Sequence, residues 1–119
     1  MDKIPRSSKE SEALLRSLMP ESKEVSLRPM FGNLSAFVNG NMSVGVYGDD
    51  LFVRLSEPDR AELLKVKGAA LFEPMKGRQM KEYVVFPRSW MRDPAKLSPW
   101  VTRSIEWSSK LPSKKSKKR

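Results

Sequence analysis

The segment RPMFGNLSAFVNGNMSVGVYGDD, residues 28–50, places four glycines among alternating apolar and polar residues. Met42, Val44 and Val46 recur with a spacing of two, which predicts a strand with one apolar face. A phosphate-binding loop is also rich in glycine, but neither the G-x-x-x-x-G-K-[ST] spacing nor the G-x-G-x-x-G spacing is present. The segment is therefore interpreted as part of a sheet and not as a loop that grips a nucleotide.

Three of these glycines have structural interpretations. Asn39 and Gly40 predict a two-residue hairpin turn, because a type I′ turn needs positive φ at both central residues. Gly48 starts a second, slightly longer turn that ends at Asp50. Gly45 lies inside a strand pattern, where a missing side chain indicates a bulge or close packing by a helix.

A first helix is expected before the strands. Ser7 and Glu10 fit a capping box, in which each side chain bonds to an unpaired amide of the first turn. The inward stripe of this helix is predicted to contain four apolar residues, namely Ala13, Leu14, Leu15 and Leu18. Pro20 ends the pattern, so the helix has about three turns.

Two more helices are expected downstream. Ser56 is the predicted N-cap of a short second helix, with Ala61 and Leu64 facing inward and Leu63 as a further candidate. The third helix is predicted to start at Ser98 and Pro99, since proline is tolerated only in the first turn. Its inward side is predicted to carry Trp100, Val101 and Ile105.

The remaining apolar runs complete the predicted fold. Residues 83–86 are apolar on both faces, as in a central strand, and short turns between strands require antiparallel pairing. We predict an α+β fold with an antiparallel sheet of about five to six strands, in the order α-β(4)-α-β(2)-α, with the helices on one face. The domain is expected to span residues 1–111, followed by a disordered basic tail at 112–119.

The composition restricts the function. The chain of 119 residues has 39% hydrophobic and 31% charged residues, and it contains no cysteine and no histidine. It therefore lacks thiol nucleophiles, zinc-thiolate ligands and imidazole, the commonest proton shuttle near neutral pH. We expect no enzymatic activity and no cofactor. Asp49 and Asp50 are interpreted as a solvated turn, so no metal site is expected.

The sequence also suggests where the protein is found. No apolar run approaches the ~20 residues that span a bilayer, and the N-terminus lacks the apolar core of a secretory signal. We therefore expect a cytoplasmic protein without membrane contact.

Several segments together resemble a known family. RPMFGNLSAFVNGNMSVGVYGDDLFVRL, GAALFEPMKGRQMKEYVVFP and LSPW are similar to the TfoX/Sxy N-terminal domain family, from about Arg28 to Trp107. The resemblance implies an antiparallel sheet with flanking helices in a cytoplasmic protein. It also implies a regulatory role, because longer members regulate natural competence together with a cyclic-AMP-responsive transcription activator. The chain has no room for the second domain of those members, so we expect a stand-alone N-terminal domain.

The first candidate site is a protein-docking patch made of Arg28, Met30, Phe31 and Gly32. In this interpretation Arg28 and the exposed edge of Phe31 contact a protein partner, which the resemblance implies to be of the transcription-regulator type. In a purely structural interpretation, Met30 and Phe31 lie in the core and Arg28 pairs with a carboxylate. A third hypothesis is a small ligand-binding domain or enzyme with a cleft near Arg28, Glu82 and Tyr83.

The second candidate site is the C-terminal tail. The last ten residues, KLPSKKSKKR, carry six of the nine net positive charges and no acid. The candidate nucleic-acid-binding residues are Lys110, Lys114, Lys115, Lys117, Lys118 and Arg119. Because basic residues release counterions from phosphates, the tail is expected to bind nucleic acid without sequence preference. A tail that only improves solubility is the alternative.

Two further features stay open at this point. Trp90, Trp100 and Trp107 are candidates for stacking on bases, although a core position is favoured for Trp100 and partial exposure for Trp90 and Trp107. Exposed edge strands would permit pairing between two copies, so the protein is expected to be a monomer or a homodimer.

Overall fold

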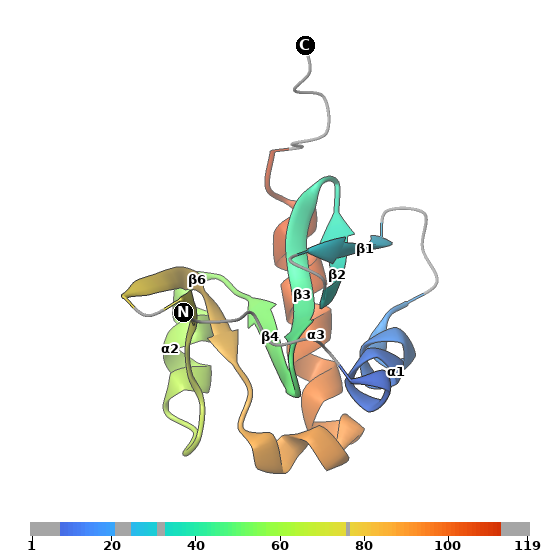
Figure 1. The fold of residues 1–119 in the computed structure, drawn as a ribbon. Helices are drawn as coiled ribbons and strands as arrows, with labels where there is room; N and C mark the ends of the chain where they lie inside the picture. Colours follow the sequence, from blue (N-terminus) through green and yellow to red (C-terminus); the bar gives the residue numbers. More distant parts are fainter. Residues whose placement is uncertain (1–7, 21–24, 31–32, 76, 113–119) are drawn as a thin grey trace.

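The computed structural model describes residues 8–20, 25–30, 33–75 and 77–112. Its helices and strands follow the predicted order, and a short 3-10 helix, η1, precedes the last α-helix (Figure 1). The elements are α1 (Lys9–Leu18), β1 (Val25–Met30), β2 (Asn33–Val38), β3 (Asn41–Tyr47), β4 (Asp50–Arg54), α2 (Glu57–Leu64), β5 (Ala70–Met75), β6 (Arg78–Val85), η1 (Arg88–Arg92) and α3 (Pro94–Ser109).

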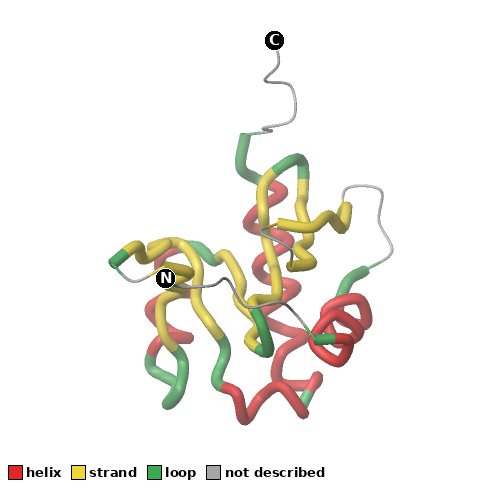
Figure 2. The backbone as a smooth tube through the Cα atoms, in the orientation of Figure 1, coloured by secondary structure: helices red, strands yellow, loops and turns green. Residues whose placement is uncertain are grey.

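The strands form one six-stranded sheet in the order β1-β2-β3-β4-β6-β5, and every neighbouring pair is antiparallel. The sheet is strongly twisted, so that β1 runs across the direction of β3 (Figures 1 and 2). The prediction of an α+β fold with an antiparallel sheet is confirmed. Strands β1 and β5 are the two edges of the sheet.

The two predicted turns between β2, β3 and β4 are present. Asn39 and Gly40 have φ values of 52° and 83°, as the predicted turn requires. Gly48 has a φ of 63°, its amide donates to the Asn33 side-chain oxygen at 3.2 Å, and its carbonyl accepts from the Ser11 hydroxyl at 3.1 Å. The second turn therefore also ties α1 to the sheet.

All three α-helices pack on the same face of the sheet, as predicted. Leu15 of α1, Leu63 of α2 and Leu97 of α3 are completely buried in one core with the apolar residues of the central strands. In Figure 1, α3 lies behind β3, with α1 and α2 to its sides. Within the described residues, none of the helices has both the length and the apolar character needed to cross a membrane.

The start of α1 differs from the prediction by one residue. Its N-cap is Ser8, whose hydroxyl accepts from the Ser11 amide at 3.1 Å, while the Ser11 side chain bonds back to the Ser8 amide. The predicted partner Glu10 is not used, and Ser7 lies outside the described residues. Ala13 is exposed, so its predicted place in the inward stripe is wrong.

The predicted face of Met42 is also wrong, because a β-bulge interrupts β3. Ala36 pairs with Val44, but the next residue of β2, Phe37, pairs with Met42, which leaves Ser43 as the extra residue. Val44 therefore faces the helices, whereas Met42 packs on the opposite face of the sheet.

The bulge also directs Ser43 towards α3. The Ser43 and Ser104 hydroxyls lie 2.7 Å apart, and the Ser104 hydroxyl donates to the Ser43 carbonyl at 2.9 Å. Both side chains are completely buried. This polar contact fixes the position of α3 on the sheet.

The other helices differ from the prediction in register. In α2, Leu63 is buried while Ala61 and Leu64 are exposed, so the inward positions assigned to the last two are wrong. Helix α3 begins at Pro94 and not at Ser98, because a proline in its first turn starts it one turn earlier. Pro99 consequently lies inside the helix, where it removes one backbone hydrogen bond.

Candidate functional site

The face of the sheet without helices carries a second apolar cluster. Its buried members are Phe37, Met42, Phe52, Phe72 and Tyr83. The rings of Phe52 and Phe72 are stacked, with centroids 4.1 Å apart and planes 12° apart. The ring of Tyr83 meets Phe52 edge-on at 5.7 Å. These aromatic contacts connect β4, β5 and β6, and the whole cluster extends from β2 to β5.

Gly45 creates the space for this cluster. A Cβ atom at this position would lie 2.6 Å from Cζ of Phe52 and 2.8 Å from the Ser35 hydroxyl oxygen. The predicted close approach is therefore real, but it is made by side chains of the neighbouring strands and not by a helix. The cluster thus depends on a missing side chain in the centre of the sheet.

Arg28 lies at one end of the cluster, on edge strand β1. Its guanidinium carbon lies 4.2 Å from the centroid of the Phe37 ring, and the residue is exposed. Among the described residues it forms no ion pair, and its predicted pairing with a carboxylate stays a prediction. The contact with Phe37 is a cation–π contact, which orients the arginine without neutralising its charge.

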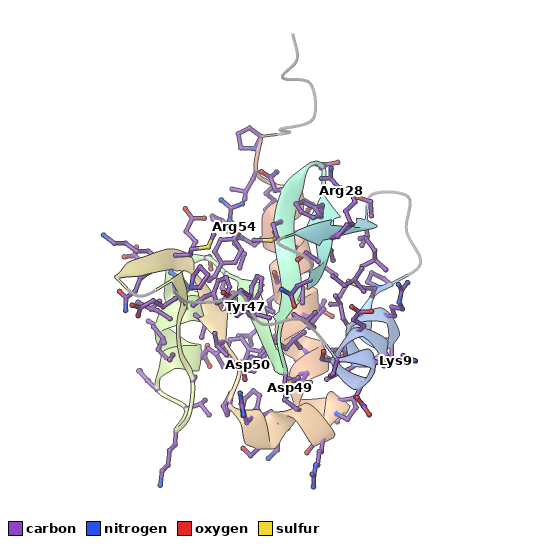
Figure 3. All side chains as sticks on the ribbon, viewed as in Figure 1. Lys9, Arg28, Tyr47, Asp49, Asp50 and Arg54 are labelled. Atoms are coloured by element: carbon purple, nitrogen blue, oxygen red, sulfur yellow. The ribbon has the colours of Figure 1, made fainter. Side chains whose placement is uncertain are left out.

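Arg54 lies at the other end of the cluster and is neutralised. It lies 2.7 Å from the Glu82 carboxylate, and its guanidinium carbon is 5.6 Å from the Tyr83 ring centroid. Its side chain is 13% exposed, compared with 50% for that of Glu82. The two arginines are seen on opposite sides of β3 in Figure 3. Of these two arginines, Arg28 is the one without an ion pair among the described residues.

Tyr83 has a structural role in the cluster. Its hydroxyl donates to the Met42 carbonyl at 3.1 Å. Burial raises the pKa of the Tyr83 phenol above its usual value of 10.0, although the nearby Arg54 opposes the shift. A phenol that holds its proton more tightly is a poor general base at neutral pH.

The residues of the hypothetical cleft are only partly brought together. Glu82 and Tyr83 adjoin Arg54 on β6, but Arg28 lies on β1, with β2, β3 and β4 between them. The surface pockets among the described residues do not lie between Arg28 and Tyr83. One of about 450 Å³ lies between the start of α1, the Gly48 turn and η1. The cleft hypothesis gains no support from this arrangement.

The other residues of the two predicted sites are placed as follows. Met30 ends β1, whereas Phe31 and Gly32 lie outside the described residues. Of the basic tail residues, Lys110 follows α3 directly, and the other five lie outside the described part of the chain. Arg28 is therefore the member of the docking patch whose surroundings are known.

The paired aspartates of the Gly48 turn have separate surroundings. Asp50 accepts from the Arg88 side chain at 2.8 Å, while Asp49 is exposed (Figure 3). Within the described ranges, no group of three acidic, histidine or cysteine side chains is arranged to hold a metal ion.

All three tryptophans are half-buried, as expected for Trp90 and Trp107 but not for Trp100, for which a core position was favoured. The sequence analysis did not identify the cations on two of the rings: Lys96 lies 6.0 Å from the Trp90 ring centroid and Arg103 lies 4.5 Å from that of Trp100. The signal was present in the sequence as basic and aromatic residues that alternate at helical spacing after Pro94.

Comparison with known proteins supports one family. The model of the TfoX N-terminal domain family matches residues 16–108, which is most of the chain. Searches of curated proteins and of solved structures found no match. The matched range includes all six strands and ends one residue before the end of α3.

Proposed function

Because the chain belongs to the TfoX N-terminal domain family, we propose that it is a non-enzymatic regulatory adaptor that docks on a protein partner through the β1 edge of its sheet. The observation that carries this proposal is the environment of Arg28. Its guanidinium is exposed, lies over the Phe37 ring at 4.2 Å and has no ion pair among the described residues. The proposed role places the protein in the cytoplasm, as the resemblance implies.

The chemistry of this arginine suggests the chemistry of the partner. A guanidinium whose flat face rests on an aromatic ring keeps its N–H edges free, and those edges match a carboxylate in a bidentate arrangement. The ring also restricts the arginine before binding, which lowers the entropy lost on contact. We propose that the partner presents an aspartate or glutamate to Arg28.

The edge strand offers a second kind of contact. Strand β1 pairs with β2 on one side only, so backbone groups on its other side are available to an extended segment of a partner. Pro29 interrupts this row, since proline has no amide hydrogen, and this limits pairing between two copies of the chain. An acidic extended segment of a transcription regulator fits both features.

Site-specific photo-crosslinking in the native host tests the docking proposal. Ser26 is exposed and lies two residues from Arg28, so both side chains are on the same face of β1. A crosslinking residue at position 26 is expected to trap one discrete protein, which the same residue at exposed Lys65 does not trap. If both positions trap the same proteins, or position 26 traps none, the proposal is wrong.

A second proposed function concerns the tail, because six basic residues and no acid occupy the last ten positions. We propose that this tail holds the adaptor near nucleic acid without sequence preference. Replacing Lys114, Lys115, Lys117 and Lys118 by glutamine should reduce the salt dependence of duplex DNA binding, with a slope change of about 0.9 per lost phosphate contact. An unchanged slope would show that the tail contributes no binding.

A further inference from the structure

A row of basic and aromatic residues runs along one side of α3. Its members, here called the α3 ridge, are Lys96, Trp100, Arg103, Trp107 and Lys110. They are separated by four, three, four and three positions, the spacing that keeps side chains on one side of a helix. At 1.5 Å per residue the row is about 21 Å long.

The ridge adjoins the buried side of the helix, because Trp100 packs against the main core and the indole nitrogen of Trp107 is buried. Leu97, Val101 and Ser104 face the sheet and are completely or almost completely buried, whereas the three basic members of the ridge are exposed. Trp100 and Trp107 are half-buried, so part of each ring is accessible to solvent. No acidic residue belongs to the ridge, although α3 carries Glu106 on its outer side.

One basic and one aromatic member of the ridge, Arg103 and Trp100, are in direct contact, and Lys96 lies near a third ring. The Arg103 guanidinium carbon is 4.5 Å from the Trp100 ring centroid. The Lys96 ammonium is 6.0 Å from the ring of Trp90, on the preceding η1. All three tryptophans of the protein therefore lie on or beside the ridge, and each side chain that supplies a positive charge is next to an aromatic ring or at the end of the row.

We infer that the α3 ridge binds single-stranded nucleic acid. Proteins that bind single strands combine a row of positive charges, which follows the phosphates, with aromatic rings on which bases stack. Bases in a duplex are stacked on each other and hidden from such rings, so a single strand fits better than a duplex. The row of charges also favours a polyanion over a neutral peptide.

Acidic side chains of α2 modulate this surface. Arg103 lies 3.5 Å from the carboxylates of both Asp59 and Glu62, with side-chain exposures of 31% and 62% for the two acids. Exposed ion pairs of this kind contribute about 0–1 kcal/mol, so a phosphate is able to compete for the arginine. These acids should weaken nucleic-acid binding, and their removal should strengthen it.

A salt titration with matched charge variants tests the inference. The probe is a fluorescein-labelled oligothymidine, and its binding to the full chain is followed by fluorescence anisotropy. The ridge variant carries Lys96→Gln, Arg103→Gln and Lys110→Gln. The control variant loses the same charge through Lys65→Gln, Lys67→Gln and Lys81→Gln, all exposed and outside the ridge. Unchanged circular dichroism and melting temperatures establish that both variants are folded.

The expected results follow from counterion release. On single strands the slope of log K against log salt is about −0.7 per phosphate contact. The ridge variant lacks three basic side chains, so its slope should be smaller in magnitude by about 2, whereas the slope of the control variant should hardly change. The inference is overturned if both variants lose the same slope, if the ridge variant is unchanged, or if the ridge substitutions weaken binding to a duplex of equal length as much as binding to the single strand. If the ridge variant binds the oligothymidine like the natural protein, while the tail variant with four lysines replaced binds it more weakly, binding belongs to the tail alone.

A variant with the opposite expected effect provides an independent test. Asp59→Asn with Glu62→Gln removes the acids that face Arg103 without altering the ridge itself. We expect tighter binding of the oligothymidine, by about threefold to tenfold at low salt. Unchanged or weaker binding would overturn the inference. None of these outcomes depends on the Arg28 docking proposal, which lies on the opposite face of the sheet.

Discussion

Replacing Ser104 by alanine should destabilise the protein more than replacing Ser104 and Ser43 together. The two hydroxyls are 2.7 Å apart, and Ser104 also donates to the Ser43 carbonyl at 2.9 Å. Both residues are completely buried, so neither hydroxyl can form a hydrogen bond with water when its partner is removed. The contact exists because the β-bulge directs Ser43 towards α3.

The magnitude follows from the number of polar groups left without a partner. Ser104→Ala removes the acceptor of the Ser43 hydroxyl and the donor to the Ser43 carbonyl. A buried unpaired group costs about 1–3 kcal/mol, so the free energy of unfolding should fall by about 2–4 kcal/mol. The double variant also deletes the unpaired Ser43 hydroxyl and should recover about 1 kcal/mol or more. Ser43→Ala alone keeps one of the two bonds and should cost about 1 kcal/mol.

Urea unfolding of the single and double variants measures these values, and an unchanged m-value establishes that the unfolded states are comparable. Ser109→Ala is the control, since this hydroxyl is exposed on the same helix and should change stability by no more than about 0.5 kcal/mol. Additive costs, with the double variant less stable than Ser104→Ala, would refute the reasoning, because they would show that Ser43 and Ser104 do not meet.

Three other variants test the turns and the aromatic cluster. Gly45→Ala places a Cβ 2.6 Å from Phe52, so urea unfolding should show a loss of about 1–3 kcal/mol, and an unchanged midpoint would contradict the packing. Gly40→Ala forces alanine into a φ of 83° and should cost about 1–2 kcal/mol in the same assay; equal stability would show that the turn is not strained by a side chain. Burial raises the pKa of Tyr83 above 10.0, so the phenol loses its proton at a lower pH in the unfolded chain than in the folded one. The protonated phenol therefore contributes its whole stabilisation below pH 10.0, and this contribution declines as pH rises through the pKa of the folded state. Tyr83→Phe should therefore lose less stability than the natural protein between about pH 9 and pH 11; parallel pH profiles would contradict the assignment.

Much of the fold is predictable because local rules determine it. The Asn39-Gly40 turn and the antiparallel order follow from backbone preferences and short connections, and the residues apolar on both faces, such as Val84 and Tyr83, do lie in a central strand. The bulge at Ser43 was not predictable, because its partner Ser104 is 61 positions away in the sequence. A strict alternation therefore placed Met42 on the wrong face.

The candidate site was predictable only in part. The sequence singled out Arg28, but its ring partner Phe37 is set by the pairing of β1 with β2, which alternation alone does not specify. Trp100 was expected in the core because apolar spacing does not distinguish a buried position from a flanking one. The contact of Arg103 with the Trp100 ring requires both residues to lie within the helix. The sequence predicts the start of this helix at Ser98, four residues after its actual start at Pro94.

The central claim is that Arg28 binds a protein partner and contributes little to the stability of the fold. The most direct measurement combines Arg28→Ala with the crosslinking residue at position 26, and compares crosslinking yield with melting temperature. Loss of a charged bidentate contact, worth about 1.5–3 kcal/mol, should reduce the yield about tenfold or more, whereas loss of the cation–π contact between exposed Arg28 and Phe37 should cost only about 0.5–1 kcal/mol of stability. A clearly lower melting temperature with an unchanged yield would contradict the claim.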